Sequence, residues 1–429
     1  MNEIVIHGLG YVGLTAAVHY ARAGWNVLGY DPDLHTVNLV NAGHPRAREF
    51  LSYLDASIHE LVLSRKIVAT TDFTRTHDYL FHVLAVPTEK DGQPYDEIIE
   101  HSLCALIERT PDNTLIMIES TVTPGFIDRL RAMPIFEARV GNSAFVAVCP
   151  RRDWFADPQK NLETLPRIVG GVTRACTARA VETIKHVSKT IYTTDYRTAE
   201  LCKALENALL HVPLMFAYQL AHALPDHNVA EALRLAGTHW RLTPLYLGFG
   251  TGGRCVPLGT QYLVRAAKGW LDLGKRALEW DEGFRALIAD IVEKAMPKKV
   301  LVLGMAYRPE FRDMGLSPGL AVAKHLHARR IFVRVHDTMW SPGELKKITG
   351  LRGDVSLASS TMMHEFDVVL LATPHKHYHV LPSDPTLWRR GQIVLDGPGA
   401  WSDQRHAFEK YGVIYKQVGE PGWMTLGRG

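Results

Sequence analysis

The feature that most constrains the fold of this chain is a glycine pattern directly behind its first apolar stretch. Gly8-Leu-Gly-Tyr-Val-Gly13 follows the strand-like run Ile4–His7 and opens a stretch of helical character. In that setting the first glycine permits a tight turn, and the second lets the backbone approach a pyrophosphate at the positive end of the helix. The third lets the helix pack closely on the strand. The pattern therefore predicts a Rossmann-type βαβ unit that binds a dinucleotide.

The second strand-like run ends in an acid that extends this prediction. Val27–Tyr30 is followed by Asp31, about twenty residues beyond the glycines. A carboxylate at that point accepts hydrogen bonds from the adenosine ribose and would repel the additional phosphate of NADP. The sequence therefore predicts NAD as the cofactor.

Two later strand ends carry threonines beside prolines, in Pro87-Thr88 and in Ser120-Thr121-Val-Thr-Pro124. Ligands of an open parallel sheet lie beyond the carboxyl ends of its strands, so both threonines are expected near the nicotinamide. Each is also explained as a turn-forming hydroxyl beside proline. The predicted cofactor-binding residues are Gly8, Gly10, Tyr11, Val12, Gly13, Asp31, Pro87, Thr88 and Thr121.

Short β-branched runs alternate with amphipathic stretches at both ends of the chain, a pattern typical of parallel sheets covered by helices. The predicted strands are Ile4–His7, Val27–Tyr30, Phe81–Val86, Leu115–Glu119, Phe145–Val148, Val300–Gly304, Phe332–His336, Val368–Ala372 and Ile393–Asp396. Between the two series, helical periodicity dominates, including Ala199–Ala223. We therefore expect an α/β protein with two Rossmann-like, doubly wound parallel-sheet domains joined by a long-helix central segment. The expected boundaries are 1–197, 198–295 and 296–429.

The composition excludes several classes of protein. Among 429 residues, 46% are hydrophobic and 22% charged, which excludes a disordered or low-complexity chain. Lys and Arg number 48 against 45 Asp and Glu, so a net charge of +3 argues against nucleic acid or membrane as the main partner. The first residues read as a strand rather than a signal peptide, and no apolar run reaches the roughly 18 residues that span a bilayer.

The five cysteines are too few and too scattered for a disulfide framework or a zinc site. This predicts a reducing, cytoplasmic location and no bound metal. Cys255 differs from the others because it follows the glycine-rich run Gly248–Gly253, whose backbone amides can approach a ligand. It is a candidate nucleophile, whereas isolated cysteines are usually inert core residues.

Two further clusters allow opposing interpretations. Lys203 and Asn207 lie four residues apart and share one helix face, where they could polarise a substrate oxygen or simply face solvent. His375, His377 and His379 alternate after the predicted strand Val368–Ala372. Alternate histidines could hold a metal, but such a run is more often a solvated loop.

Taken together, these motifs resemble the UDP-glucose/GDP-mannose dehydrogenase family. The resemblance rests on Gly8–Gly13 with Asp31, Pro87-Thr88, Ser120–Gly125, Ala199–Asn207, Gly248–Cys255, Val300–Pro309 and Ser317–Leu326. It implies that NAD oxidises a primary alcohol of a nucleotide sugar twice, through a cysteine thiohemiacetal and a thioester that water hydrolyses. It also implies a homodimer formed through the central helix and a carboxy-terminal domain that binds the nucleotide.

The resemblance also implies roles for individual residues. Cys255 matches the family's nucleophile, Lys203 and Asn207 match the residues that stabilise the oxyanion, and Thr121 matches the threonine that positions a water. The residues expected at the substrate are Arg151, Arg152, Lys203, Asn207, Phe249, Gly250, Gly252, Arg254 and Arg308.

Departures from the family pattern concern its general-base carboxylates. Leu258 and Gly259 stand where the family has a lysine and a water-activating aspartate, and Arg151 and Phe155 stand at two glutamates. One interpretation is that Asp153, Asp157 or a histidine supplies the base.

A second interpretation is incomplete or transient oxidation, such as aldehyde or ketone formation, epimerisation or elimination, on a nucleotide sugar or a nucleoside. A third is a non-catalytic NAD-binding protein, which the retention of Cys255, Lys203 and Asn207 argues against.

Overall fold

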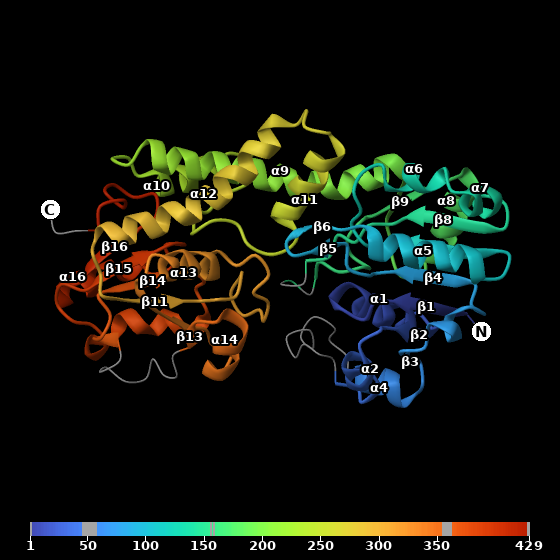
Figure 1. The fold of residues 1–429 in the computed structure, drawn as a ribbon, viewed down its shortest axis with the longest axis horizontal. Coiled ribbons are helices and arrows are strands. Elements are labelled where there is room, and N and C mark those ends of the chain that lie inside the picture. Colours follow the sequence, from blue (N-terminus) through green and yellow to red (C-terminus); the bar gives the residue numbers. More distant parts are fainter. Residues whose placement is uncertain (1, 45–57, 155–156, 158, 354–362, 427–429) are drawn as a thin grey trace. The chain divides into compact units, whose positions relative to one another are not determined.

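The computed structural model describes residues 2–44, 58–154, 157, 159–353 and 363–426 (Figure 1). The chain divides into two compact units. The first unit comprises Met1–Glu206 and Gln261–Trp270, and the second comprises Asn207–Thr260 and Leu271–Gly429. The expected central segment 198–295 therefore contributes to both units, and its status as a separate domain stays a prediction.

The first unit is built on an eight-stranded sheet of order β10-β9-β8-β7-β4-β1-β2-β3 (Figure 1). Its strands are β1 (Glu3–His7), β2 (Asn26–Tyr30), β3 (Ile67–Thr70), β4 (Phe81–Leu84), β7 (Thr114–Ile118), β8 (Ala144–Val148), β9 (Arg167–Gly171) and β10 (Ile191–Asp195). All neighbours pair in parallel except β8 with β9. The order from β3 to β8 is the doubly wound one, so the expected fold is confirmed.

Helices follow the strands of this sheet and cover it. They are α1 (Tyr11–Arg22), α2 (Leu34–Asn41), α4 (Ile58–Leu63), α5 (Glu97–Arg109), α6 (Phe126–Arg131), α7 (Pro134–Arg139) and α8 (Arg174–Ile184), and β5 (Glu89–Lys90) and β6 (Gln93–Pro94) form a small hairpin. Successive β7 residues enter two different cores, Leu115 and Met117 one core and Ile116 and Ile118 the other. Both faces of the sheet are therefore covered, as a near-continuous apolar strand predicts.

The second unit contains a six-stranded sheet of order β13-β12-β11-β14-β15-β16, all parallel. Its strands are β11 (Lys299–Leu303), β12 (Phe332–His336), β13 (Arg352–Gly353), β14 (Val368–Leu371), β15 (Ile393–Asp396) and β16 (Ile414–Gln417). The helices α13 (Pro318–Ala328), α14 (Pro342–Thr349) and α16 (Arg405–Tyr411) accompany it. This sheet repeats the 3-2-1-4-5-6 strand order of the first, which confirms the second Rossmann-like fold.

The middle of the chain is helical, as expected: α9 (Tyr196–Ala223), α10 (Val229–Ala236), α11 (Val256–Ala266) and α12 (Asp272–Lys294). α9 passes from the first unit into the second. Met215 and Tyr218 of α9 join Phe284 and Ile288 of α12 in the core of the second unit. Within the described residues, no helix is long and apolar enough to cross a membrane.

Candidate functional site

The turn between β1 and α1 has the geometry that a dinucleotide requires. A Cβ on Gly13 would lie 1.8 Å from the Gly8 carbonyl oxygen, so only glycine lets α1 pack this closely on the turn. A Cβ on Gly10 would meet nothing within 4 Å, and this N-cap glycine has no side chain that could occupy the amides that begin α1. The positive end of α1 at this turn therefore fits a pyrophosphate.

Asp31 lies immediately after β2 and is tied to this turn. Its Oδ2 accepts a hydrogen bond from the Leu9 amide at 2.8 Å, and its Oδ1 accepts one from the Asp33 amide at 2.9 Å. Each carboxylate oxygen keeps a second lone pair, so the group can still accept hydrogen bonds from ribose hydroxyls. The residues present therefore fit NAD.

The two threonines expected near the nicotinamide belong to one hydrogen-bonded network. The Thr88 hydroxyl donates to the Thr121 carbonyl at 2.6 Å, and the Tyr262 hydroxyl donates to the Thr88 carbonyl at 2.6 Å. Thr88 is buried, whereas Thr121 is half-buried and Pro87 is exposed. Thr88 thus holds the ends of β4 and β7 together, and Thr121 is the more accessible of the two.

Arg151 follows β8 and is fully enclosed. Its guanidinium donates to the Val12 carbonyl and Glu119 through Nη1, to the Thr15 hydroxyl through Nη2, and to Asp153 through both Nε and Nη2. These bonds use all five donors of an arginine. This geometry argues against the expected contact with substrate phosphates, because a phosphate would have to displace a buried partner. Of the neighbouring family position, Phe155, nothing is stated, since it lies outside the described residues.

Arg152 reaches α9 through a glutamate that the sequence analysis overlooked. Arg152 Nε lies 2.7 Å from Glu206 Oε1, and Lys203 Nζ lies 3.7 Å from Glu206 Oε2. The Lys203 side chain is 17% exposed and that of Glu206 is 31% exposed, so these charges lie at the surface of the first unit. The i, i+3 spacing of Lys203 and Glu206 was visible in the sequence and could have identified the pair.

The cysteine loop, Gly248–Cys255, belongs to the second unit and is fixed by α12. The Thr251 amide donates to Asp281 Oδ1 at 2.8 Å, the Thr251 hydroxyl donates to Asp281 Oδ2, and the Thr251 carbonyl accepts from Arg285 at 2.8 Å. Gly250 has φ +124°, and a Cβ there would lie 3.0 Å from both side chains of α12. The glycines therefore let the loop lie directly against α12.

Asp281 is buried, but its surroundings favour the charged carboxylate. Burial by itself would raise the pKa of Asp281, but His211, Arg285 and Thr251 together hold it below its ordinary value. His211 also contacts the Thr260 hydroxyl at 2.9 Å. The loop before Cys255 and the helix after it are thus attached to neighbouring elements of the second unit.

Cys255 is the exposed member of the five free cysteines; the others are buried or half-buried. Its carbonyl accepts the Gly259 amide at 2.9 Å, so the cysteine lies at the amino-terminal end of α11. Of its expected neighbours, Arg254 is exposed, whereas Phe249 is 1% exposed and belongs to the core. Phe249 therefore supports the loop from inside.

Tyr307 follows β11 and lies against the same loop, and Arg308 is the next residue. A Cβ on Gly252 would lie 2.9 Å from Tyr307, and the Gly253 amide donates to the Gly315 carbonyl at 2.9 Å. Burial is the main reason that the pKa of Tyr307 is raised to about 12. Arg308 is half-buried, and its guanidinium lies 3.9 Å from the centre of the Phe311 ring.

The carboxyl ends of the second sheet differ from those of the first. Asp337, which corresponds to Asp31 in the strand order, accepts from the Met305 and Ala306 amides and contacts His375 Nε2 at 3.1 Å. His375 is 0% exposed, so the interpretation of this histidine run as a solvated loop is wrong at that residue. Both groups fix the turn after β11. No cluster of potential metal ligands occurs within the described residues.

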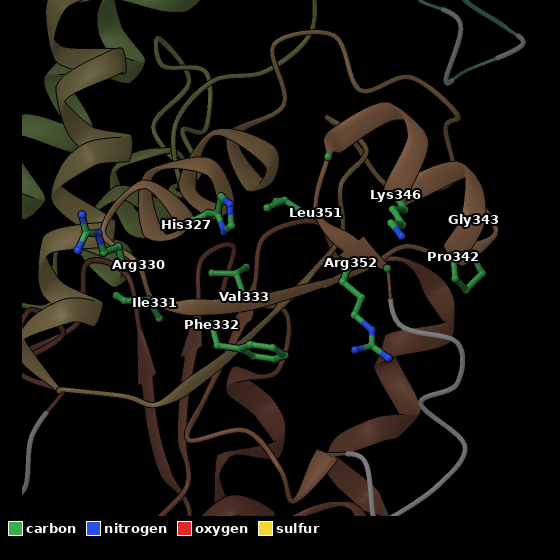
Figure 2. A pocket seen from close by; sticks show the side chains of 12 residues that line it. His327, Arg330, Ile331, Phe332, Val333, Pro342, Gly343, Lys346, Leu351 and Arg352 are labelled. Atoms are coloured by element: carbon green, nitrogen blue, oxygen red, sulfur yellow. The ribbon is translucent and has the colours of Figure 1, made fainter.

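A cavity of about 810 Å³ lies elsewhere in the second unit. Figure 2 shows the side chains of His327, Lys346 and Leu351 around it, with Phe332 and Arg352 nearby. None of the residues that line this cavity is a candidate site residue.

These features define an NAD-dependent oxidoreductase built on two Rossmann-like sheets with a cysteine loop between them in the sequence. Models of the UDP-glucose/GDP-mannose dehydrogenase family match nearly the whole chain: the NAD binding domain at residues 2–192, the central domain at 197–276 and the UDP binding domain at 301–403. The chain belongs to this family, and it is a nucleotide-sugar dehydrogenase.

Individual relatives agree with this assignment. UDP-N-acetyl-D-mannosamine dehydrogenase of Escherichia coli K12 is 28% identical, over 93% of this chain and 99% of the relative. The enzyme of the same name from Pyrococcus horikoshii is 29% identical, over 92% of this chain and 95% of the relative. A solved structure of the P. horikoshii UDP-D-ManNAc dehydrogenase has a TM-score of 0.85 at 26% identity, covering 98% of this chain and 100% of the other.

Proposed function

We propose that this chain oxidises the primary alcohol of UDP-N-acetylmannosamine, or a closely similar UDP-N-acetylhexosamine, to the carboxylic acid. The substrate class comes from the curated relatives, which carry that name and align over nearly their whole length. The observation that carries the proposal is the placement of Cys255: an exposed thiol at the amino-terminal end of α11, following a loop that is fixed by α12.

The proposed chemistry gives separate tasks to NAD, to Cys255 and to the polar residues around them. NAD, held at the turn before α1 and by Asp31, supplies the hydride acceptor. Cys255 adds to the aldehyde from the first oxidation, and the hemithioacetal loses the second hydride to become a thioester. Lys203 and Asn207, one helical turn apart on α9, stabilise the oxyanions by charge and hydrogen bonding. Thr121, half-buried at the end of β7, positions the water that attacks the thioester.

Recognition of the diphosphate falls to two arginines. Arg254 precedes the nucleophile and is exposed, and the half-buried Arg308 follows Tyr307, whose ring lies against the glycines of the loop. Arginine binds phosphate in a bidentate manner, which suits either position. Arg151 is left out of this role because its donors are all used inside the first unit.

The protein is proposed to act as a cytoplasmic homodimer that pairs along α9. Apolar side chains of α9 are exposed, namely Leu201 43%, Leu205 39%, Leu209 65%, Leu210 45% and Phe216 64%. Three of them recur every four residues and so form one stripe, the kind of surface that a partner covers. Light scattering should find a dimer, and Leu209→Glu should yield monomers; a wild-type monomer would contradict the proposal.

A turnover assay tests the proposed activity. The protein is incubated with NAD and a panel of UDP-, GDP- and CDP-sugars and free nucleosides, and NADH and product mass are followed together. Complete oxidation yields two NADH and one acid for each UDP-N-acetylmannosamine. Incomplete or transient oxidation yields one or no net NADH with an altered product. If no compound of the panel gave NADH or an altered product, the protein would be one that only binds NAD.

The role of the thiol has a separate test. Cys255→Ser should abolish acid formation while leaving NAD affinity unchanged, because the cofactor's glycines and Asp31 lie in the first unit. Cys202→Ser, a half-buried cysteine on α9, is the matched control. Undiminished acid from Cys255→Ser would remove the covalent step from the mechanism.

A further inference from the structure

Glu206 combines an accessible carboxylate with a place on the Lys203–Asn207 turn of α9. It immediately precedes Asn207 and follows Lys203 by three residues, so the three side chains emerge within one turn. Its side chain is 31% exposed and that of Lys203 is 17% exposed. A ligand held by Lys203 and Asn207 would therefore lie within reach of this carboxylate.

The two oxygens of Glu206 have different surroundings. Oε1 lies 2.7 Å from Arg152 Nε, whose guanidinium also donates to the Pro166 carbonyl at 3.0 Å. Oε2 lies 3.7 Å from Lys203 Nζ, an ion-pair distance that is too long for a hydrogen bond. Arg152 thus fixes the carboxylate through one oxygen, and the other oxygen remains able to accept a hydrogen bond from water.

Three other carboxylates of the first unit, those of Glu119, Asp153 and Glu200, are held by partners. Glu119 is paired with Arg151 and Arg167, and both side chains of the Arg151–Asp153 pair are less than 5% exposed. Glu200 accepts the amides of Gly125 and Ile127 with its two oxygens and so caps α6. None of these groups can take a proton from water without losing a buried partner.

The charges at the end of β8 and on α9 also differ from the family pattern. Where that pattern has a glutamate behind β8, this chain has Arg151, followed by Arg152. Arg152 in turn pairs with an acid carried by α9. The carboxylate missing from the strand end is therefore present on the facing helix, bound to the strand end by an ion pair.

We propose that Glu206 is the catalytic base that deprotonates the water in thioester hydrolysis. The inference rests on the proposed function. Water adds its oxygen to the thioester carbonyl and gives one proton to Glu206 Oε2; the carbon–sulfur bond then breaks and its electron pair leaves with the Cys255 sulfur. The product is the acid, and the proton returns to solvent. No oxidant beyond the two NAD already used is required.

Glu206→Gln separates hydrolysis from oxidation. The amide keeps the size and the contact with Arg152 but cannot accept the proton. With NAD and UDP-N-acetylmannosamine, the variant should release a burst of two NADH for each Cys255, and steady acid formation should then fall by about 100-fold or more. Intact-mass spectrometry should find the acyl group on Cys255, and hydroxylamine should remove it as a hydroxamate.

Matched variants complete the test. Glu182→Gln removes another i, i+3 glutamate–lysine pair of the first unit and should behave as wild type. Glu206→Asp should recover part of the hydrolysis rate. If Glu206→Gln lost the NADH burst, Glu206 would act by positioning Lys203 rather than as a base. If the variant formed acid at the wild-type rate, Glu206 would not be needed for hydrolysis. Either result overturns the proposal. A wild-type protein that releases no NADH would instead refute the proposed function.

Discussion

At the scale of single residues, Asp31 has two tasks that a substitution can separate. It accepts the Leu9 and Asp33 amides and is expected to hold the adenosine ribose. Asp31→Ala should weaken NAD binding by about 1.5–3 kcal/mol, the usual contribution of a hydrogen bond to a charged group. Calorimetry measures this loss. Asp33→Ala, which removes the cap of α2 but no ribose contact, should leave NAD affinity within about twofold.

Arg151 should matter to stability rather than to substrate affinity. Arg151→Met leaves Glu119 and Asp153 buried with fewer positive partners, and breaking a buried ion pair costs about 3–5 kcal/mol. Denaturant unfolding should detect a loss of that size. Arg152→Met removes a half-buried cation and should cost about 1 kcal/mol or less. Equal losses in the two variants would contradict the assignment.

The contrast between these arginines marks what the sequence could and could not predict at this scale. The glycines and Asp31 were predictable because their roles depend on neighbours within one βαβ unit. Two of the partners of Arg151, Val12 and Thr15, lie more than a hundred residues away, and no local pattern indicates them. The spacing of Glu206 from Lys203 was visible in the sequence, but its ion pair with Arg152 was not, because that pair depends on the fold.

At the scale of elements, α12 acts on chemistry through the loop that it supports. Asp281→Ala removes two hydrogen bonds to Thr251 and the ion pair between Asp281 and Arg285. The loop before Cys255 should loosen, and kcat should fall by about 10-fold or more, since small misplacements of a nucleophile are costly. NAD affinity should stay unchanged because that site lies in the first unit.

The control for this prediction lies on the same helix. Asp272→Ala changes the first turn of α12, away from the loop, and should keep kcat within about twofold of wild type. Steady-state kinetics with calorimetry for NAD measures both variants. An Asp281→Ala enzyme with normal kcat would show that the loop keeps its position without α12.

Most of the predicted strands contain a run of β-branched or other apolar residues, although β3 (Ile67–Thr70) has such a run and was overlooked. β12 was predicted at its observed bounds, Phe332–His336, and β4 ends two residues before the predicted Val86, as the chain turns toward Pro87. β10 was overlooked because its pattern alternates weakly and Tyr192 is 62% exposed. β9 was overlooked because its apolar run is interrupted by glycines. Edge and glycine-rich strands depend on pairing partners that a sequence does not reveal.

At the scale of the whole molecule, acid should act mainly through a histidine pair inside the first sheet. His7 Nε2 and His82 Nδ1 lie 3.0 Å apart on β1 and β4, and His82 Nε2 lies 2.9 Å from the Tyr79 carbonyl. Burial, followed by the neighbouring His82 and His77, holds the pKa of His7 well below its ordinary value. Burial likewise lowers the pKa of His82 to about 4.

The sign of the pH effect follows from these directions. An unfolded histidine takes up a proton near pH 6.5, but folded His82 resists protonation until about pH 4, and the pKa of folded His7 is also well below its ordinary value. At these two sites the unfolded chain therefore binds more protons in this range, and their contribution to stability falls as the pH drops from about 6.5 towards 4. For His82 alone the loss approaches about 3 kcal/mol at the lower limit.

Replacing the pair tests this directly. His7→Val with His82→Val removes both titrating groups from strands that favour β-branched residues, so the double variant should lose less stability than wild type between pH 7 and pH 4.5. Denaturant unfolding of the full chain at several pH values measures the difference. His35→Ala, an exposed histidine on α2, should retain the wild-type slope. If the free energy of unfolding of the double variant fell with pH as steeply as that of wild type, the acid sensitivity would belong to other groups.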